Sequence, residues 1–487
     1  MTKVSLGNEL QDVGEQEVRE DVRIEKDLLG TKTLPANAYY GINSVRAAEN
    51  YTVSGYSLHP ELIIGLAMVK KAAALANLRA GQLEPKKAQA IVQAADEIIS
   101  GKWHDQFIGE AIQGGAGTGM NMNANEVIAN RALEILGYKP GDYYMIHPLD
   151  DVNKGQSTND VVPTAIRIAA IRMLEGYVKA AELLSNTLRE KAAQYQNAPK
   201  LGRTHLQDAV PITIGQELNA WASAVARDIE RGRKAMDLLS VVNLGGTAIG
   251  TCINANPLYV ECVVDELRKC SGIDSLRPAA DRIDATQNID VLVEVSGLMK
   301  STATTLTKIC NDLRLMASGP MAGLAEVRLP AIAAGSSIMP GKINPVIPEM
   351  VNQVCFKIYG NDLTISLAAS AGQFELNVMQ PVLSFALFES IEMMVRAMES
   401  LALKVIKDME FNTKRCESYA RNSLSLVTVL APVVGHSVAT EIAKKAMDTG
   451  QDILSVIVES QVLDENTARR LLDPRRMTTL VPDDDDD

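Results

Sequence analysis

The sequence predicts a mainly α-helical protein built around a bundle of long helices. Hydrophobic residues make up 46% of the 487 residues but aromatic residues only 4%, and alanine and leucine dominate the long uninterrupted stretches. This composition favours helix over sheet. The long stretches also carry apolar residues on more than one face, so the helices need neighbours. We therefore expect a helical bundle that packs against other copies of the chain.

The predicted long helices follow one another through the middle of the chain. The first runs from Pro163 to about residue 197 with Gly176 as its only glycine, which is roughly nine turns at about 3.6 residues each. A second follows Pro211 and runs to about residue 242, and a third covers about 284–316. Further helices follow prolines 348 and 381. These lengths exceed the usual helix of about 11–12 residues, which again predicts bundle packing.

Changes in helix length along the sequence predict three domains. Before about residue 157 and after about residue 411 the helical segments shorten and helix breakers become more frequent. A chain of this length is also too long for one compact core. We predict a mostly helical N-terminal domain at 1–155, a central long-helix bundle at 156–411 and a small C-terminal helical domain at 412–487, whose acidic tail is Asp483–Asp487.

Charge and composition exclude several function classes. The net charge of −12 argues against nucleic acid and anionic membranes as partners. No apolar run reaches about 18 residues without a charge or breaker, and the first residues lack the apolar core of a signal peptide. The six cysteines form no Cys-x-x-Cys pair and do not cluster with the five histidines, so neither a metal site nor a disulfide framework is expected. We expect a cytoplasmic enzyme.

The most informative segment is the run at 335–345, Gly-Ser-Ser-Ile-Met-Pro-Gly-Lys-Ile-Asn-Pro. Glycine and proline at both ends predict a loop. Within it, Lys342 supplies positive charge and Asn344 directional hydrogen bonds, while Ser336 and Ser337 can donate, accept or, if deprotonated, remove a proton. These side chains suit an anionic substrate.

Three further polar clusters are expected at helix starts. Residues 114–119 precede a helix near Asn121, residues 156–160 precede the first long helix, and residues 202–205 precede the second. A helix start exposes unpaired N–H groups and about half a positive charge, which together bind anions. For each cluster taken alone, ordinary N-capping remains open as the alternative.

These four segments resemble the signature blocks of the aspartase/fumarase superfamily, and the resemblance extends from about residue 23 to about residue 472. Blocks 114–118 and 344–349 look like the aspartase branch of the superfamily and unlike its fumarate hydratases. The resemblance implies a three-domain fold whose central helices form the core of a homotetramer with shared active sites. It also implies the reversible deamination of L-aspartate to fumarate and ammonia, without a cofactor.

The resemblance also implies roles for individual residues. Ser336 would be the general base, and His205 would be a second catalytic residue near the amino group, together with Asn159. The residues expected to bind the β-carboxylate are Thr118, Ser157, Thr158 and Ser337. Those expected to bind the α-carboxylate are Thr204, Lys342 and Asn344, and Met339 is also expected to contact the substrate. Two alternatives for His205 remain open, pairing with Glu349 and an inert place in the core.

Two other functions remain open. One is a fumarate hydratase or a related lyase acting on another amino dicarboxylate, and the other is a non-catalytic helical scaffold. The joint presence of a loop serine, lysine and asparagine with Thr204 and His205 argues against the scaffold, since helix packing requires none of them. Three positions depart from the superfamily pattern: Gly119 stands in place of serine, Asp151 of histidine and Met321 of arginine.

Overall fold

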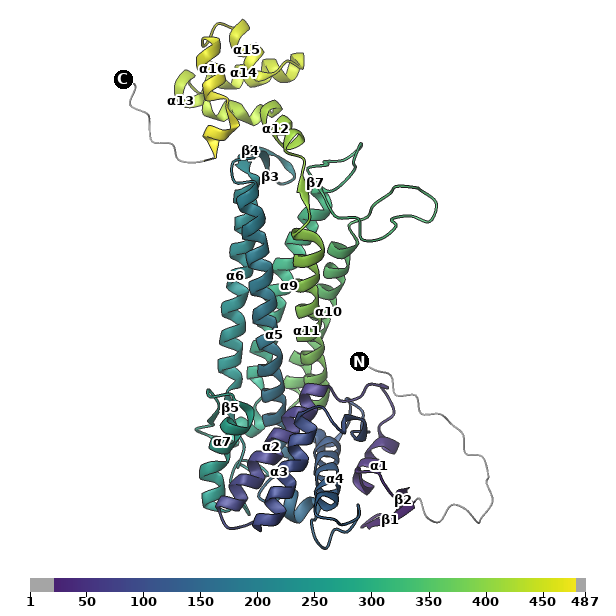
Figure 1. Ribbon diagram of the computed structural model, residues 1–487. Helices are drawn as coiled ribbons and strands as arrows, with labels where there is room; N and C mark the ends of the chain where they lie inside the picture. Colours follow the sequence, from purple (N-terminus) through teal and green to yellow (C-terminus); the bar gives the residue numbers. More distant parts are fainter. Residues whose placement is uncertain (1–21, 479–487) are drawn as a thin grey trace. The chain divides into compact units, whose positions relative to one another are not determined.

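The computed structural model describes residues 22–478 and confirms the mainly helical prediction (Figure 1). The first 21 residues, for which the absence of a signal peptide is predicted, and the acidic tail Asp483–Asp487 lie outside the described residues. The five long helices are α5 (Thr158–Gln194), α6 (Ile214–Leu239), α9 (Asp290–Met316), α10 (Val346–Ser370) and α11 (Gln380–Leu401). Their positions match the predicted long helices within several residues. None of the helices described is long and apolar enough to cross a membrane.

By its internal contacts the chain groups into two compact units, and their boundaries fall within the long helices. Unit 1 comprises 1–178, 230–301 and 357–393, and unit 2 comprises 179–229, 302–356 and 394–487. This grouping does not test the predicted division at 155 and 411, which stays a prediction.

Unit 1 contains the shorter N-terminal helices, of which α2 packs against both α3 and α7. Pro60 and Pro257 occupy the first turns of α2 and α7, where a missing backbone N–H does no harm. The elements of this unit outside the long helices are β1 (Val22–Asp27), β2 (Gly30–Pro35), α1 (Ile42–Asn50), α2 (Pro60–Arg79), α3 (Pro85–Ile99), α4 (Thr118–Ile135), β5 (Val241–Val242), α7 (Pro257–Ser271), β6 (Arg277–Pro278) and α8 (Arg282–Gln287).

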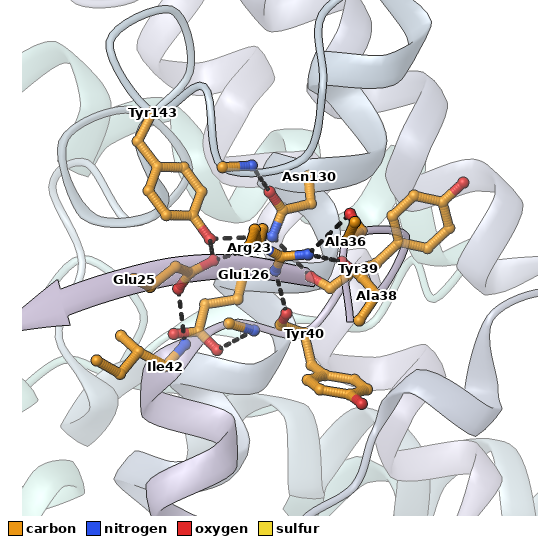
Figure 2. A network of polar contacts seen from close by, with 12 residues as sticks. Arg23, Glu25, Ala36, Ala38, Tyr39, Tyr40, Ile42, Glu126, Asn130 and Tyr143 are labelled. Carbon is orange, nitrogen blue, oxygen red and sulfur yellow. Dashed lines mark hydrogen bonds and ion pairs between the residues drawn. The ribbon is translucent and has the colours of Figure 1, made fainter. Parts of the chain in front are cut away.

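Within unit 1, buried polar contacts fix α1 against α4 (Figure 2). Glu126 of α4 accepts the backbone N–H groups of Gly41 and Asn43, both at 2.8 Å, at the start of α1. Glu25 of β1 accepts the N–H of Ile42 at 2.8 Å and the hydroxyl of Tyr143 at 2.9 Å. Two carboxylates therefore satisfy the unpaired N–H groups that every helix start exposes, and they hold the start of α1 against the middle of α4 and against β1.

Unit 2 contains a β-hairpin and a group of short C-terminal helices, which Figure 1 shows gathered in yellow. That group has its own apolar core, to which Leu430, Ile442, Val456 and Ile457 contribute fully or almost fully buried side chains. Outside the long helices, the elements of this unit are β3 (Pro199–Thr204), β4 (Gln207–Thr213), β7 (Val327–Arg328), β8 (Glu410–Phe411), α12 (Thr413–Asn422), α13 (Ala431–Val434), α14 (His436–Thr449), α15 (Ile453–Glu459) and α16 (Glu465–Leu471).

Two sequence predictions about local structure were wrong. Residues 202–205 do not lie at a helix start, because 202–204 end β3, His205 begins the turn of an antiparallel hairpin, and α6 begins only at Ile214. The helix predicted at 284–316 is two helices, since Asn288 adopts an extended backbone (φ −101°, ψ 132°) that ends α8 before α9 begins.

Candidate active site

The start of α5 presents three of the predicted ligands. Ser157 caps the helix: its Oγ accepts the N–H of Asn159 at 3.2 Å, while its own N–H donates to the carboxylate of Asp160 at 2.9 Å. This reciprocal pattern is a capping box. The capping interpretation is therefore correct for Ser157, yet its hydroxyl proton is left to donate elsewhere. Ser157, Thr158 and Asn159 are all half-buried.

Side chains of α4 hold the start of α5 in place within unit 1. The Asn121 amide donates to Thr158 Oγ1 at 3.1 Å, and Asn159 donates to the carbonyl of Ala248 at 2.7 Å. Sequence reasoning missed Asn121. The sequence contains a signal for this residue: asparagine is a poor residue for a helix interior, yet Asn121, Asn123 and Asn125 alternate within one predicted helix. The structure buries all three side chains.

Thr118 begins α4 directly after a tight turn. Residues Gly115, Ala116 and Gly117 have φ values of 73°, 56° and 87°, and glycine adopts this left-handed region without steric cost. The exposed Thr118 hydroxyl donates to the carbonyl of Gly115 at 2.7 Å. Gly115 and Gly117 thus allow the sharp turn that places Thr118 in the first turn of α4, three residues before the predicted helix start near Asn121.

The glycine at 119 has a structural account. A Cβ added there would lie 2.4 Å from Oε1 of Gln113 and 3.1 Å from Cβ of Ala47. The same Oε1 accepts the N–H of Met120 at 3.0 Å. Any side chain at 119 must therefore displace the Gln113 amide from the start of α4, so glycine is matched to Gln113 in this chain.

Thr204 and His205 lie at the tip of the β3–β4 hairpin in unit 2. His205 and Leu206 form its two-residue turn with φ values of 55° and 60°, the conformation that two-residue hairpins favour. Both Thr204 and His205 are exposed. The alternative that His205 is an inert core residue is therefore wrong. Among the described residues, His205 forms no ion pair with Glu349.

A buried group of charges supports the base of this hairpin. Arg203 makes two hydrogen bonds to Glu326, at 3.0 and 2.8 Å, and Nζ of Lys200 lies 3.7 Å from the same carboxylate. The Glu326 side chain is 0% exposed and that of Lys200 3%. Lys200 also binds Glu217 at 2.8 Å. The residue directly before Thr204 is thus fixed by a bidentate ion pair.

Glu326→Gln is expected to lower the free energy of unfolding by about 3 kcal/mol, because it removes the carboxylate that pairs with Arg203 and leaves the buried Lys200 with Glu217 alone. Denaturant unfolding measures the change. Glu410→Gln is the matched control, since Glu410 pairs with Arg328 where both side chains are mostly exposed and such pairs contribute little. Equal effects of the two substitutions would refute this account of the hairpin base.

The predicted loop is confirmed: neither helix nor strand is present between β7 and α10. Its central feature is Ser336, whose Oγ accepts the backbone N–H groups of Ile338 at 3.2 Å and Met339 at 3.0 Å. Two N–H groups aimed at one oxygen stabilise negative charge on it. Ser336 is half-buried, while Ser337, Met339 and Lys342 are exposed.

The two ends of the loop are tied to each other. The N–H of Gly335 donates to the carbonyl of Lys342 at 3.0 Å, and the Asn344 amide donates to the carbonyl of Gly335 at 2.7 Å. A Cβ on residue 335 would lie 2.1 Å from the Lys342 carbonyl oxygen, so only glycine permits this close approach. These hydrogen bonds close the loop at its base, so that residues 336–341 lie between two joined ends.

The structure distributes the predicted residues over the two units. Unit 1 holds Thr118, Ser157, Thr158 and Asn159, and unit 2 holds the hairpin pair Thr204 and His205 and the loop residues Ser336, Ser337, Met339, Lys342 and Asn344. No hydrogen bond among the described residues joins the hairpin pair to the loop. Within residues 22–478, no group of three or more His, Cys, Asp or Glu side chains is placed to hold a metal ion.

Comparisons with known proteins agree along most of the chain. A family model described as lyase matches residues 30–360, and a model of the fumarase C C-terminus matches residues 426–479. An aspartate ammonia-lyase of a Bacillus species is 50% identical over 94% of this chain and 98% of that protein. The aspartate ammonia-lyase of Pseudomonas aeruginosa is 48% identical over 94% of this chain and 98% of its own length.

Solved structures of lyases share the fold of this chain. A structure described as fumarate lyase:delta crystallin from Brucella melitensis bound to cobalt superposes with a TM-score of 0.92 at 48% identity, covering 94% of this chain and 100% of that one. The class II fumarase from Schistosoma mansoni superposes with a TM-score of 0.89 at 33% identity, covering 94% and 99%.

Proposed function

This chain belongs to the lyase family, and we propose that it catalyses the reversible deamination of L-aspartate to fumarate and ammonia. Relatives of nearly equal length that are named aspartate ammonia-lyases support the carbon–nitrogen lyase activity. The more distant likeness to a class II fumarase, at 33% identity, is the reason to keep malate as the competing substrate.

The observation that carries the mechanism is the pair of N–H groups at Ser336. A serine hydroxyl is a poor base unless its surroundings favour the alkoxide. The backbone N–H groups of Ile338 and Met339 donate to its Oγ and would become stronger donors as negative charge develops there. This geometry supports Ser336 as the general base.

The proposed reaction proceeds in two steps. The Ser336 alkoxide removes a proton from the carbon beside the β-carboxylate, and the electron pair of that C–H bond moves into the carboxylate to give an enediolate. The enediolate then collapses to the carbon–carbon double bond of fumarate, and the electron pair of the C–N bond leaves with ammonia. Hydrogen-bond donors at the β-carboxylate stabilise the intermediate by about 3–4 kcal/mol each.

Two groups of donors fit the two carboxylates. Thr118 and Thr158 lie in the first turns of α4 and α5, and Ser157 caps α5, where the helix dipole favours negative charge. We assign these residues with Ser337 to the β-carboxylate, and the Thr118 hydroxyl would turn from the carbonyl of Gly115 to the substrate. Lys342, Asn344 and Thr204 would bind the α-carboxylate, with Asn159 and His205 near the amino group. The exposed apolar side chains of Ile338 (84%), Met339 (48%) and Ile343 (53%) suit a loop that closes over the substrate.

One experiment tests this function against its alternatives. Formation of fumarate is followed by ultraviolet absorbance with L-aspartate and then with L-malate. Faster conversion of L-aspartate supports the proposal, faster conversion of L-malate supports a hydratase, and no conversion of either supports the non-catalytic scaffold.

We also propose a cytoplasmic homotetramer with active sites shared between subunits, because the predicted ligands are exposed or half-buried and fall into separate groups on one chain. Sedimentation of the pure protein is expected to give a tetramer, and activity is expected to fall when dilution dissociates it. A stable, fully active monomer would overturn this assembly.

A further inference from the structure

Lys70 in the middle of α2 is buried, and among residues 22–478 no carboxylate lies at hydrogen-bonding distance from it. Lys70 is 0% exposed, and its ammonium donates to two amide oxygens, Asn153 Oδ1 at 2.8 Å and Gln156 Oε1 at 2.9 Å. Burial lowers the pKa of Lys70 to about 7, an effect opposed by the negative charge of Asp160. Burying a cation on neutral partners is costly, so the two amide contacts of Lys70 call for a reason beyond the packing of an apolar helix face.

Both partners of Lys70, Asn153 and Gln156, lie in the segment that directly precedes α5. Gln156 is the residue before Ser157, and its amide is held in turn by the carbonyl of Val152 at 2.9 Å. Asn153 Oδ1 also accepts from the Asn125 amide at 3.2 Å, and Asn121, which donates to Thr158, lies 3.4 Å from the same oxygen. The ammonium therefore joins the segment entering α5 to the α4 side chains that hold Thr158.

A buried carboxylate lies in the first turn of α5. Asp160 is 0% exposed, and besides the N–H of Ser157 it accepts those of Gly245 at 3.1 Å and Thr247 at 3.0 Å. Burial raises the pKa of Asp160 to about 6. An ionised Asp160 would repel a substrate carboxylate at the start of α5, and the Lys70 charge opposes that repulsion.

We propose that Lys70 is a positioning residue for carboxylate binding at the start of α5. Its ammonium holds Gln156 and Asn153 so that Ser157 and Thr158 present their donors to the substrate, and its charge offsets that of Asp160. This role rests on the proposed function, because it deepens the assignment of Ser157 and Thr158 to a dicarboxylate substrate.

The test compares Lys70→Met with Lys71→Met. Methionine matches the length of lysine but lacks its charge and donors, and the adjacent Lys71 serves as a control because it pairs at the partly exposed surface with Asp96 at 2.6 Å. Lys70→Met is expected to raise KM for L-aspartate at least about tenfold, with a smaller fall in kcat, whereas Lys71→Met leaves both unchanged. Lys70→Gln, which keeps a donor but not the charge, is expected to lie between them.

A double-substitution cycle shows whether Lys70 acts through its partner. Gln156→Leu is expected to raise KM by itself, and Lys70→Met combined with Gln156→Leu is expected to be little worse than the more severe single substitution. A lower melting temperature for Lys70→Met with KM and kcat within a factor of two of the parent would overturn the proposal, since it marks a purely structural role. If Lys70→Met does not fold, unchanged KM values in both Lys70→Gln and Gln156→Leu overturn it, and raised values in both support it.

Succinate binding separates this proposal from the proposed function. Calorimetry measures the affinity of the parent and of Lys70→Met for succinate, a dicarboxylate that cannot lose ammonia. If the parent forms no fumarate from L-aspartate, the proposed function fails, yet weaker succinate binding by Lys70→Met still supports the positioning role. Equal succinate affinity in the two proteins overturns that role.

Discussion

Replacing Ser336 with alanine is expected to lower kcat for L-aspartate by about a thousandfold or more, equivalent to about 4 kcal/mol. The substitution removes the oxygen on which the N–H groups of Ile338 and Met339 converge, so no group remains at that point to take the proton. Fumarate absorbance under saturating L-aspartate measures the effect. Exchange of the hydrogen beside the β-carboxylate with solvent deuterium should be lost in parallel, because it depends on the same base.

Folding and assembly of this variant should be unchanged, since Ser336 is a half-buried loop residue that contributes little packing. Ser337→Ala is the matched control: it removes one of several donors assigned to the β-carboxylate, so a smaller loss is expected. If Ser336→Ala kept turnover within about tenfold of the parent enzyme, the base would have to be sought elsewhere.

Sequence patterns predicted the helices well where capping chemistry is local. Ser157 and Asp160 form a capping box within four residues, and prolines mark several other starts. The beginning of α5 was nevertheless predicted five residues late, at Pro163, because that proline lies inside the helix and not at its start. The hairpin at 199–213 was missed because its turn lacks the usual glycine or asparagine. His205 and Leu206 adopt positive φ there, and only the pairing of β3 with β4 maintains that conformation.

The sequence predicts a set of candidate site residues but not their geometry. Ser336, Lys342 and Asn344 are candidates from one continuous segment and their roles stay predictions, whereas the two N–H groups at Ser336 depend on how the loop folds back on itself. Lys70 illustrates a stronger limit. In sequence it is an ordinary helical lysine next to Lys71, and its burial depends on partners 83 and 86 positions away.

The second large effect concerns Lys342, whose charge we assign to the α-carboxylate. Its carbonyl accepts the N–H of Gly335 at 3.0 Å, so its backbone forms part of the hydrogen bonds that join the two ends of the loop. Its side chain is exposed. Binding a carboxylate at this point would fix the same loop that carries Ser336. Binding energy from the remote carboxylate would then be used to place the base.

Lys342→Met is therefore expected to lower kcat/KM for L-aspartate by about a hundredfold, or about 2.7 kcal/mol, through effects on both KM and kcat. Lys444→Met, which alters an exposed lysine of α14, serves as the control and should have no effect. L-Alanine and β-alanine each lack one carboxylate and should react far more slowly than L-aspartate with the parent enzyme, because neither can engage both groups of donors. If Lys342→Met kept kcat/KM for L-aspartate within a factor of about three, a difference under about 0.7 kcal/mol, Lys342 could not bind the α-carboxylate, and another cation would have to close the loop.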